Sequence, residues 1–256
     1  MDNWTDLIDD LVAGRWFNQE TQEMAKVPFE SIVIKKNLAG IEVDLLADVG
    51  FNKNLVMVCD QTTYEALGRR IKEAFKATGE LDVLVLESPH ADLRYVEDLR
   101  KKIVTYDGVV AVGSGTINDV CKHSTMLNGQ RYAVFATAGS MNGYTSTTAS
   151  MRLDSGLKIS LPSHAPAGFF VDLEVSAEAP AYLAASGFGD CLCRSVAQVD
   201  WWLSHRLLGS LYLQSPYTIQ EKDEPELNSR AGNLAIGDIE ATGYLHRVLT
   251  LGGLGV

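Results

Sequence analysis

Short apolar runs alternate with longer segments of helical periodicity from residue 31 to about residue 135. Runs without polar alternation are typical of parallel strands that helices cover on both faces. Strands followed by helices in this way predict βαβ units and a twisted parallel sheet. The expected strands are Ser31–Ile34, Leu55–Cys59, Val83–Leu86, Val109–Val112 and Tyr132–Ala136.

Two of the intervening segments predict amphipathic helices. Thr62-Thr63-Tyr64-Glu65 has the spacing of a capping box, and an apolar stripe follows it as far as Gly79, an expected C-terminal stop. A second helix is expected over residues 92–106, because its apolar residues recur at helical spacing.

The pattern changes after about Asp172. We expect a long buried helix over Gly187–Leu208, a loop over the polar stretch Gln220–Arg230, and a further helix over Leu234–Leu251 that ends at Gly252-Gly253. The chain therefore predicts an α/β domain over residues 1–172 and an all-helical domain over residues 173–256.

Composition and charge narrow the classes of partner. The chain has 256 residues, of which 46% are hydrophobic and 21% charged, as in an ordinary globular protein. Its net charge of −11 repels phosphate backbones and anionic lipids, so neither nucleic acid nor membrane is an expected partner. No apolar run approaches the roughly 18 residues that a membrane-spanning helix needs.

The N-terminus and the cysteines bear on location. Residues 1–6 lack the basic and then apolar layout of a secretory signal. The cysteines show neither a disulfide framework nor zinc-knuckle spacing. We therefore expect a cytoplasmic protein with reduced thiols. The four cysteines are Cys59, Cys121, Cys191 and Cys193.

The first segment with candidate chemistry is Val109–Asp119, a buried strand that runs through Gly-Ser-Gly into a helix. Glycines allow close backbone approach, and the free N–H groups of a helix start favour a phosphate. No Lys follows the second Gly as in a P-loop, and the strand Val56–Asp60, with its terminal acid, precedes the glycines instead of following them. A phosphate site and a plain strand-to-helix turn both stay open.

Two later segments also combine small or polar residues with a buried element. Phe135–Ser146 leaves a strand and is rich in hydroxyl and amide side chains, which suit a ligand or simply a loop. Ala184–Arg194 contains Asp190, either an acid at the start of a helix or a metal ligand. The histidines show no helical zinc-site spacing and are expected to be surface or packing residues: His90, His123, His164, His205 and His246.

Taken in order, these segments resemble the glycerol-1-phosphate dehydrogenase family, most closely its bacterial AraM-like branch, within the iron-containing alcohol dehydrogenase, glycerol dehydrogenase and dehydroquinate synthase superfamily. The resemblance covers nearly the whole chain. The matching motifs are Trp4–Ile8, Gly14–Trp16, Pro28–Glu30, Gly113–Asp119, Thr137–Ser146, Gly187–Asp190 and Asp200-Trp201.

This resemblance implies a Rossmann-like first domain, with NAD or NADP bound between the two domains. Gly113, Gly115, Thr116 and Asp119 are the residues implied for the diphosphate side. Thr137, Ser140 and Ser146 are implied near the nicotinamide, and Asp60 at the adenosine ribose. A carboxylate at Asp60 favours NADH, because it would repel a 2′-phosphate.

The resemblance also implies a reaction. A divalent metal, zinc or nickel, with Asp190 as ligand and catalytic residue, polarises the ketone of dihydroxyacetone phosphate. Hydride from the cofactor then gives sn-glycerol 1-phosphate. Asn142 and Asp190 are the implied substrate-binding residues, and a homo-oligomer is the implied assembly.

Two departures from the family pattern stand out. Asn142 replaces the usual Asp, which removes a negative charge and favours a phosphorylated substrate over glycerol. The family takes two metal-ligating histidines from a region that follows the last residue of this chain, whereas a catalytic zinc normally has three protein ligands. His205 and His246 do not match those positions. We therefore expect the helical domain to be incomplete and to expose apolar surface.

Three other functions compete with this one. A glycerol or polyol dehydrogenase differs by preferring unphosphorylated substrates. A dehydroquinate synthase needs basic side chains around an acidic substrate, for which this region offers mainly Arg131, Arg152 and Lys158. The missing histidines also allow a catalytically inactive nucleotide-binding fragment, which would bind the cofactor without turnover.

Overall fold

The computed structural model describes residues 6–76, 79 and 81–255. Trp4 and Thr5, the start of the first resembling motif, lie outside the described residues. Helix α1 (Asp6–Val12) comes first, followed by a short antiparallel pair, β1 (Phe17–Asn18) and β2 (Glu23–Met24).

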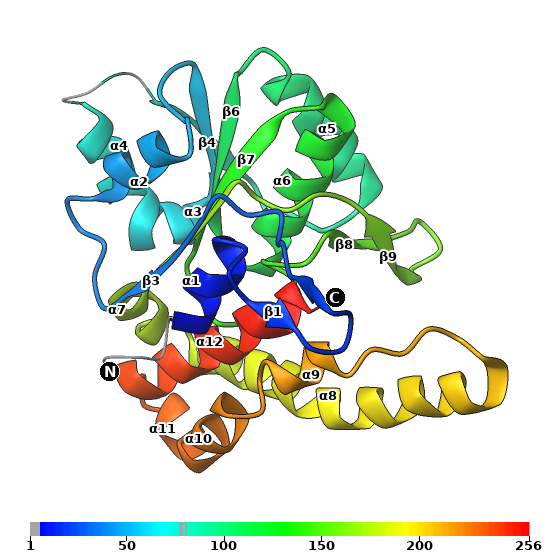
Figure 1. Ribbon diagram of the computed structural model, residues 1–256. Helices are drawn as coiled ribbons and strands as arrows, with labels where there is room; N and C mark the ends of the chain where they lie inside the picture. Colours follow the sequence, from blue (N-terminus) through cyan, green and yellow to red (C-terminus); the bar gives the residue numbers. More distant parts are fainter. Residues whose placement is uncertain (1–5, 77–78, 80, 256) are drawn as a thin grey trace.

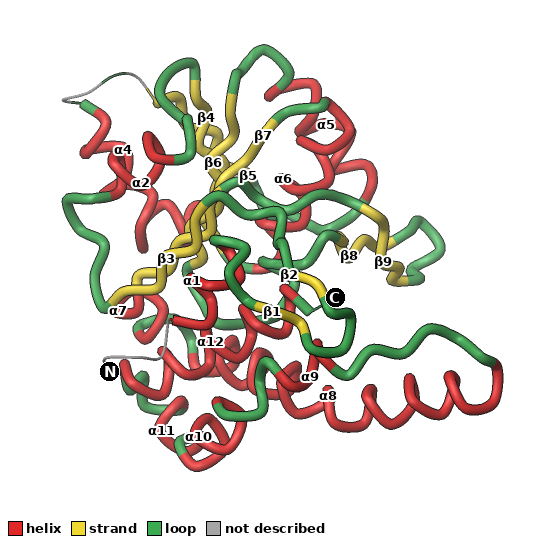
Figure 2. Tube along the Cα trace, viewed as in Figure 1, coloured by secondary structure: helices red, strands yellow, loops and turns green. Residues whose placement is uncertain are grey.

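A parallel sheet occupies the centre of the molecule, drawn in yellow in Figure 2, in the order β3-β10-β7-β6-β4-β5. The five predicted strands are confirmed within a few residues at each end. The sixth, β10, was not predicted, although its sequence Gly-Phe-Phe-Val-Asp is as apolar as the others. The strands are β3 (Ser31–Lys35), β4 (Leu55–Asp60), β5 (Leu81–Leu86), β6 (Gly108–Gly113), β7 (Arg131–Ala136) and β10 (Gly168–Asp172).

Helices cover both faces of this sheet (Figure 1). Val109 and Ala111 of β6 pack on one side with α5 (Leu93–Ile103) and α6 (Gly115–Asn128). Val110 and Val112 pack on the other side with α2 (Glu42–Asp48) and α4 (Arg69–Phe75). Because successive strand residues point to opposite faces and both faces are buried, these strands show no polar alternation. The prediction of a Rossmann-like α/β fold is thereby confirmed.

The capping box predicted at Thr62–Glu65 was wrong by two residues. Asp60 is the N-cap of α3 (Gln61–Thr63): its carboxylate accepts the Thr63 N–H at 2.8 Å, and the Thr63 hydroxyl accepts the Asp60 N–H at 3.1 Å. The helix therefore starts directly at the end of β4 and continues through η1 (Tyr64–Gly68) into α4. Near the predicted stop, the Gly79 N–H donates to the Phe75 carbonyl.

The part after β10 is helical, as predicted, and α12 crosses beneath the sheet against α8 and α7 (Figure 1). None of the described helices combines the length and apolarity that crossing a membrane requires. The helices are α7 (Leu173–Ala177), α8 (Ala181–Leu208), α9 (Ser215–Thr218), α10 (Asp223–Ser229), α11 (Ala231–Leu234) and α12 (Ile239–Leu254). The boundary between two domains at residue 172 stays a prediction.

Two predictions in this part were wrong. The expected loop Gln220–Arg230 contains α10. Pro225 is compatible with this helix, because it occupies the third helical position, where its missing N–H costs no hydrogen bond. Leu227 on the same helix is buried in the helical core. The expected end of α12 at Gly252-Gly253 lies inside the helix. A Cβ on Gly253 would lie 2.4 Å from the Asn142 carbonyl oxygen, so this glycine permits close packing instead of ending the helix.

The predicted burial of the long helix was also wrong. Of α8, Gly187, Cys191 and Arg194 are buried, whereas its second half projects away from the sheet (Figure 1). Val196 is 63% exposed and Leu207 72% exposed. The apolar sequence predicted burial. The segment after α8 contacts this half at Trp201, whose ring packs on Tyr212 and whose N–H donates to the Leu211 carbonyl. Val196 and Leu207 nevertheless stay exposed. This agrees with the expectation of exposed apolar surface.

Candidate functional site

The sheet order places a natural binding position at its carboxyl edge. From β4 the chain reaches β5 through α4 on one face, and from β6 it reaches β7 through α6 on the other face. β4 and β6 are adjacent and parallel, so their two connections leave in opposite directions. In open α/β sheets, ligands bind outside the carboxyl ends of strands at such a switch point.

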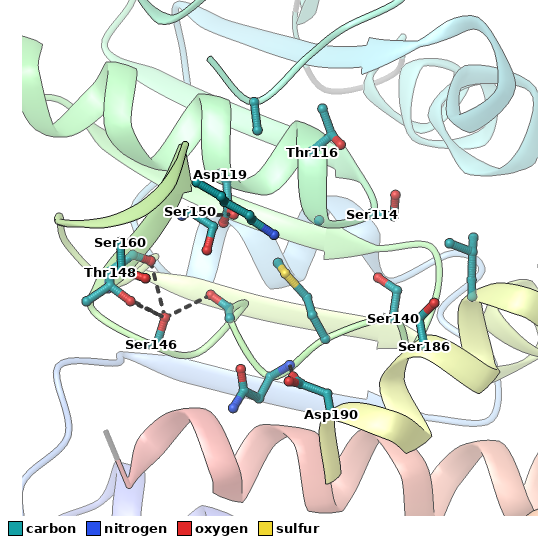
Figure 3. A pocket seen from close by; sticks show the side chains of 17 residues that line it. Ser114, Thr116, Asp119, Ser140, Ser146, Thr148, Ser150, Ser160, Ser186 and Asp190 are labelled. Carbon is teal, nitrogen blue, oxygen red and sulfur yellow. Dashed lines mark hydrogen bonds between the residues drawn. The ribbon is translucent and has the colours of Figure 1, made fainter. Parts of the chain in front are cut away.

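A cavity of about 470 Å³ lies beside this position, next to the carboxyl end of β6 (Figure 3). Five parts of the chain form its wall: the loop after β5, the start of α6, the loop after β7, the hairpin of β8 (Thr148–Arg152) with β9 (Lys158–Pro162), and one side of α8. Its lining residues are Ala91, Ser114, Gly115, Thr116, Asp119, Ser140, Met141, Asn142, Gly143, Ser146, Thr148, Ser150, Lys158, Ser160, Leu183, Ser186 and Asp190.

The N-terminus of α6 opens into this cavity. Ser114 is the N-cap, yet its side chain makes no capping hydrogen bond, and Ser114, Gly115 and Thr116 all line the cavity (Figure 3). A Cβ on Gly113 would lie 2.7 Å from the Ile117 side chain, so only glycine allows the strand to turn into the helix this tightly. Uncapped N–H groups at a helix start form a site for an anionic group.

Asp190 and Asn142 meet at the opposite end of the cavity. The Asp190 Oδ2 accepts the Asn142 N–H at 2.7 Å, which joins α8 to the loop after β7. Asp190 is the tenth residue of α8, so the reading of Asp190 as an acid at the start of a helix was wrong. A Cβ on Gly187 would lie 2.0 Å from the Gly139 carbonyl oxygen, so the missing side chain allows α8 to approach this loop.

Asp119 lies in the wall between these two ends. Its Oδ1 accepts the Asn118 side-chain N–H at 3.0 Å, and its Oδ2 accepts the Ser150 N–H at 3.2 Å. Burial raises the pKa of Asp119 above its ordinary value, although Lys122 and Lys158 oppose this shift. Because a carboxylate repels a diphosphate, the contact to Ser150 on β8 suits Asp119 better than a direct contact with that group.

The structure brings most of the predicted residues together. Gly115, Thr116, Asp119, Ser140, Asn142, Ser146 and Asp190 line the one cavity. Asp60, Gly113 and Thr137 lie outside its lining, although Asp60 and Gly113 are the last residues of the adjacent strands β4 and β6. Thr137 is buried, and its N–H donates to the Gly113 carbonyl at 3.2 Å.

Sequence reasoning missed the β8–β9 hairpin and its contribution. Ser150 pairs with Ser160 and Arg152 with Lys158, so Thr148, Ser150, Lys158 and Ser160 share the face that lines the cavity. Ala149 and Met151 point the other way into the core. The alternation of Thr148-Ala149-Ser150-Met151 was the available signal, because strands with one buried face repeat every two residues.

The donor set for a metal is incomplete within the part of the chain that the structure describes. No three His, Cys, Asp or Glu side chains there gather closely enough to hold a metal ion. His246 is fully buried, and its Nε2 lies 2.7 Å from the Ser176 hydroxyl; burial lowers its pKa to about 3. His205 contacts the Ser210 carbonyl. His246 is thus a packing residue and His205 an exposed one, and the prediction was that each is a surface or packing residue.

Comparison with known proteins agrees with this geometry. The sequence model of the iron-containing alcohol dehydrogenases matches residues 33–180, more than half of the chain. A glycerol-1-phosphate dehydrogenase [NAD(P)+] of Bacillus velezensis is 32% identical over 206 residues, covering 78% of this chain and 52% of the relative. The enzyme of the same name from Methanothermobacter thermautotrophicus is 35% identical over 173 residues, covering 66% and 48%.

The similar solved structures share the fold. Glycerol dehydrogenase from Schizosaccharomyces pombe superposes with a TM-score of 0.75 at 19% identity, over 90% of this chain and 61% of that chain. Sulfoacetaldehyde reductase from Bifidobacterium kashiwanohense in complex with NAD+ superposes with a TM-score of 0.72 at 17% identity, over 90% of this chain and 65% of that chain. The chain spans about half the length of the two curated relatives described above. On its sequence match and its fold, the chain belongs to the iron-containing alcohol dehydrogenase family.

Proposed function

We propose that this chain provides the cofactor and substrate site of an NAD(P)-dependent dehydrogenase that reduces dihydroxyacetone phosphate to sn-glycerol 1-phosphate. The supporting observation is that one cavity joins the N-terminus of α6 to Asn142 and Asp190. A cofactor bound at the helix end and a ketone bound near the carboxylate would lie within the same opening. The relatives named glycerol-1-phosphate dehydrogenase favour this reaction over others of the family.

The residues at the start of α6 fit the cofactor. The N–H groups of Gly115 and Thr116 would bind the diphosphate, since the positive end of the helix dipole stabilises its charge. Gly113 allows the turn that brings these groups forward. NAD(P)H supplies the hydride when bound, so the protein has to hold the cofactor and the ketone in a reactive geometry.

The remaining predicted cofactor residues extend this site in both directions. We assign Ser140 and Ser146, which line the cavity, and Thr137, which lies behind it, to the nicotinamide side. Asp60 would bind the adenosine ribose from the end of β4. Its carboxylate also caps α3, so the helix holds it near the switch point.

Asn142 and Asp190 would bind the ketone end of the substrate. The Asn142 backbone fixes the Asp190 carboxylate, and both residues line the cavity with side-chain groups able to hydrogen-bond a hydroxyl. Lys158 adds a cation to the wall, which would attract the phosphate of the substrate or cofactor. These groups would orient the substrate toward the nicotinamide side of the cavity.

A catalytic metal does not fit the described residues alone, because Asp190 is the one proposed ligand and no cluster of three donors surrounds it. We derive no step through a metal. Asp190 stays the candidate ligand and catalytic residue, and the choice of zinc or nickel, the homo-oligomer and the cytoplasmic location stay predictions.

A nucleotide-binding protein without turnover is the second candidate, and the incomplete donor set favours it. The assay that separates the two measures NADH and NADPH oxidation with dihydroxyacetone phosphate and with dihydroxyacetone, with and without added zinc or nickel. Turnover of the phosphorylated ketone supports the dehydrogenase. Turnover of the unphosphorylated ketone alone indicates a polyol dehydrogenase. Cofactor binding without turnover indicates a nucleotide-binding protein that has no catalytic activity.

Replacement of Asp190 tests the site assignment. Asp190→Asn should abolish metal-dependent turnover, because the amide lacks the charge that a metal needs, while the affinity for NADH stays nearly unchanged. Asp200→Asn is the matched control, since Asp200 is an exposed acid on the same helix. Wild-type turnover in Asp190→Asn would overturn the role of this residue.

A further inference from the structure

One buried charge next to the cavity has no part in the function described so far. Lys122 lies on α6 with no exposed surface. Its ammonium group donates to three backbone carbonyls: Gly143 at 2.5 Å, Ser146 at 2.8 Å and Thr148 at 3.1 Å. An ammonium group has three N–H donors, so this side chain is fully satisfied.

All three acceptors belong to one turn, residues 143–148, which we name the Lys122 turn. Gly143, Ser146 and Thr148 also line the cavity, so one side of this turn faces the ligand space and the other faces the ammonium group. The Ser146 hydroxyl contacts the Gly143 and Thr148 carbonyls as well, at 3.2 Å each. The turn is therefore folded around Lys122.

The same helix serves both sides of the cavity. Gly115 and Thr116 stand at the start of α6, and Lys122 follows Gly115 by seven residues, about two helical turns. Asn142, which holds Asp190, directly precedes the Lys122 turn, and the Thr145 hydroxyl of the turn donates to the Thr250 carbonyl of α12 at 2.9 Å. A shift of the turn against α6 would therefore change the width of the cavity.

We propose that Lys122 is a positioning residue that fixes the Lys122 turn against α6 and so sets the geometry in which Ser146 and Asn142 meet the cofactor and substrate. This inference rests on the proposed function. A buried ammonium group is an expensive way to fill a core position. An apolar side chain would remove the donor of the Ser146 carbonyl and would leave the Gly143 and Thr148 carbonyls to share the single Ser146 hydroxyl. The arrangement is thus built to hold this turn.

The charges around Lys122 agree with an ammonium group that stays protonated. Burial lowers the pKa of Lys122, and Asp119, three residues earlier on α6, opposes this shift, so that the pKa is about 8. Burial, and then the nearby charge of Lys122, lower the pKa of His164 in the segment after β9, so it adds no positive charge near neutral pH. Lys158 on β9, which lines the cavity, lowers the pKa of Asp119 by its charge.

The test compares Lys122→Met with Ser124→Ala in this chain. Ser124 is equally buried on α6, but its hydroxyl donates to the Val96 carbonyl of α5 and does not contact the turn. Two quantities are measured: the dissociation constant for NADH by fluorescence, and amide hydrogen exchange of residues 142–148. Lys122→Gln, which keeps amide donors in place of the ammonium group, serves if Lys122→Met does not fold.

We expect the dissociation constant for NADH to rise about tenfold in Lys122→Met, with faster exchange in the turn. Ser124→Ala should leave both unchanged, and Lys122→Gln should fall between wild type and Lys122→Met. Wild-type affinity in a folded Lys122→Met, or turn exchange equal to that of wild type, overturns the proposal. If wild type binds no NADH, the proposed function fails, while the exchange data still decide whether Lys122 holds the turn.

Discussion

The central sheet and the second half of α8 contain similar apolar side chains in very different surroundings. Val110 in β6 has no exposed surface, because α2 and α4 cover its face of the sheet. Val199 in α8 is 60% exposed, and several large apolar residues near it are exposed too. Apolar sequence therefore predicts burial only where the chain also supplies the partner surface.

Helix α12 shows that this difference in the burial of apolar side chains is not a difference between sheet and helix. Twelve of its residues are buried, between the loop after β7 on one side and α8 and α10 on the other. The first half of α8, which contacts α12 and Gly139, is likewise held in place. The candidate site thus lies on the well-packed part of the molecule. Asp190 stands near the end of the packed half of α8.

The largest expected effect contrasts a sheet residue with an α8 residue. Met57→Ala in β4, which has no exposed surface, should lower the free energy of unfolding by about 2 to 5 kcal/mol. Leu207→Ala in α8, 72% exposed, should change it by less than about 0.5 kcal/mol. Urea unfolding of both variants measures this. A large loss in Leu207→Ala would show that this part of α8 is covered in solution.

The pH dependence of stability tests the packing of α12. His246 has a pKa of about 3 in the folded chain against an ordinary value of 6.5, so the unfolded chain binds the extra proton between these values. This contribution to stability is complete above pH 6.5 and is lost as the pH falls toward 3.

The size of this effect follows from the two pKa values. From pH 6.5 to pH 4.5 the loss should reach about 2 to 3 kcal/mol in wild type. This part of the loss in unfolding free energy should be absent between the same two pH values in His246→Gln, whose amide can still hydrogen-bond Ser176. Urea unfolding at both pH values measures it. An equal loss in the two proteins would mean that His246 is accessible to water in the folded chain.

A pair of glycines in the first half of α8 separates the side that packs on the loop after β7 from the side that does not. Gly187→Ala should destabilise the protein by about 1 to 3 kcal/mol, because the new Cβ would overlap the Gly139 carbonyl, which belongs to the backbone. Gly189→Ala meets no atom within 4 Å and should stabilise the helix by up to about 1 kcal/mol. Thermal unfolding measures the stability change in each variant. Equal changes in the two variants would show that Gly187 is not the point where α8 contacts the loop after β7.

The sequence predicted those parts whose signal is local. The strands β3 to β7 were found because each is a short apolar run between helical patterns. The second predicted helix also starts where expected, with Asp92 as the N-cap of α5. The order of β10 between β3 and β7 depends on distant pairing, which no local pattern contains. The resemblance to the family also implied seven of the residues that line the cavity, whereas the residue patterns alone left these segments open between a ligand site and an ordinary turn or loop.

The failures have a common physical cause. Gly252-Gly253 indicated a helix end, but these glycines serve contacts with Arg194 and the Asn142–Thr145 loop, which lie far away in the sequence. Polar residues at Gln220–Arg230 indicated a loop, whereas Leu227 in this stretch is buried against other helices. Lys122 was not noticed because its three acceptors come together only in the folded chain.

Titration of the folded protein with NADH, followed by nicotinamide fluorescence, tests the central claim most directly. Gly115→Leu is the comparison, because its side chain would enter the space beside Met141 at the start of α6. The account predicts saturable binding to wild type and a loss of affinity of at least about tenfold in Gly115→Leu. Absence of saturable binding in folded wild type, or equal binding by both proteins, would contradict a cofactor site at this end of the cavity.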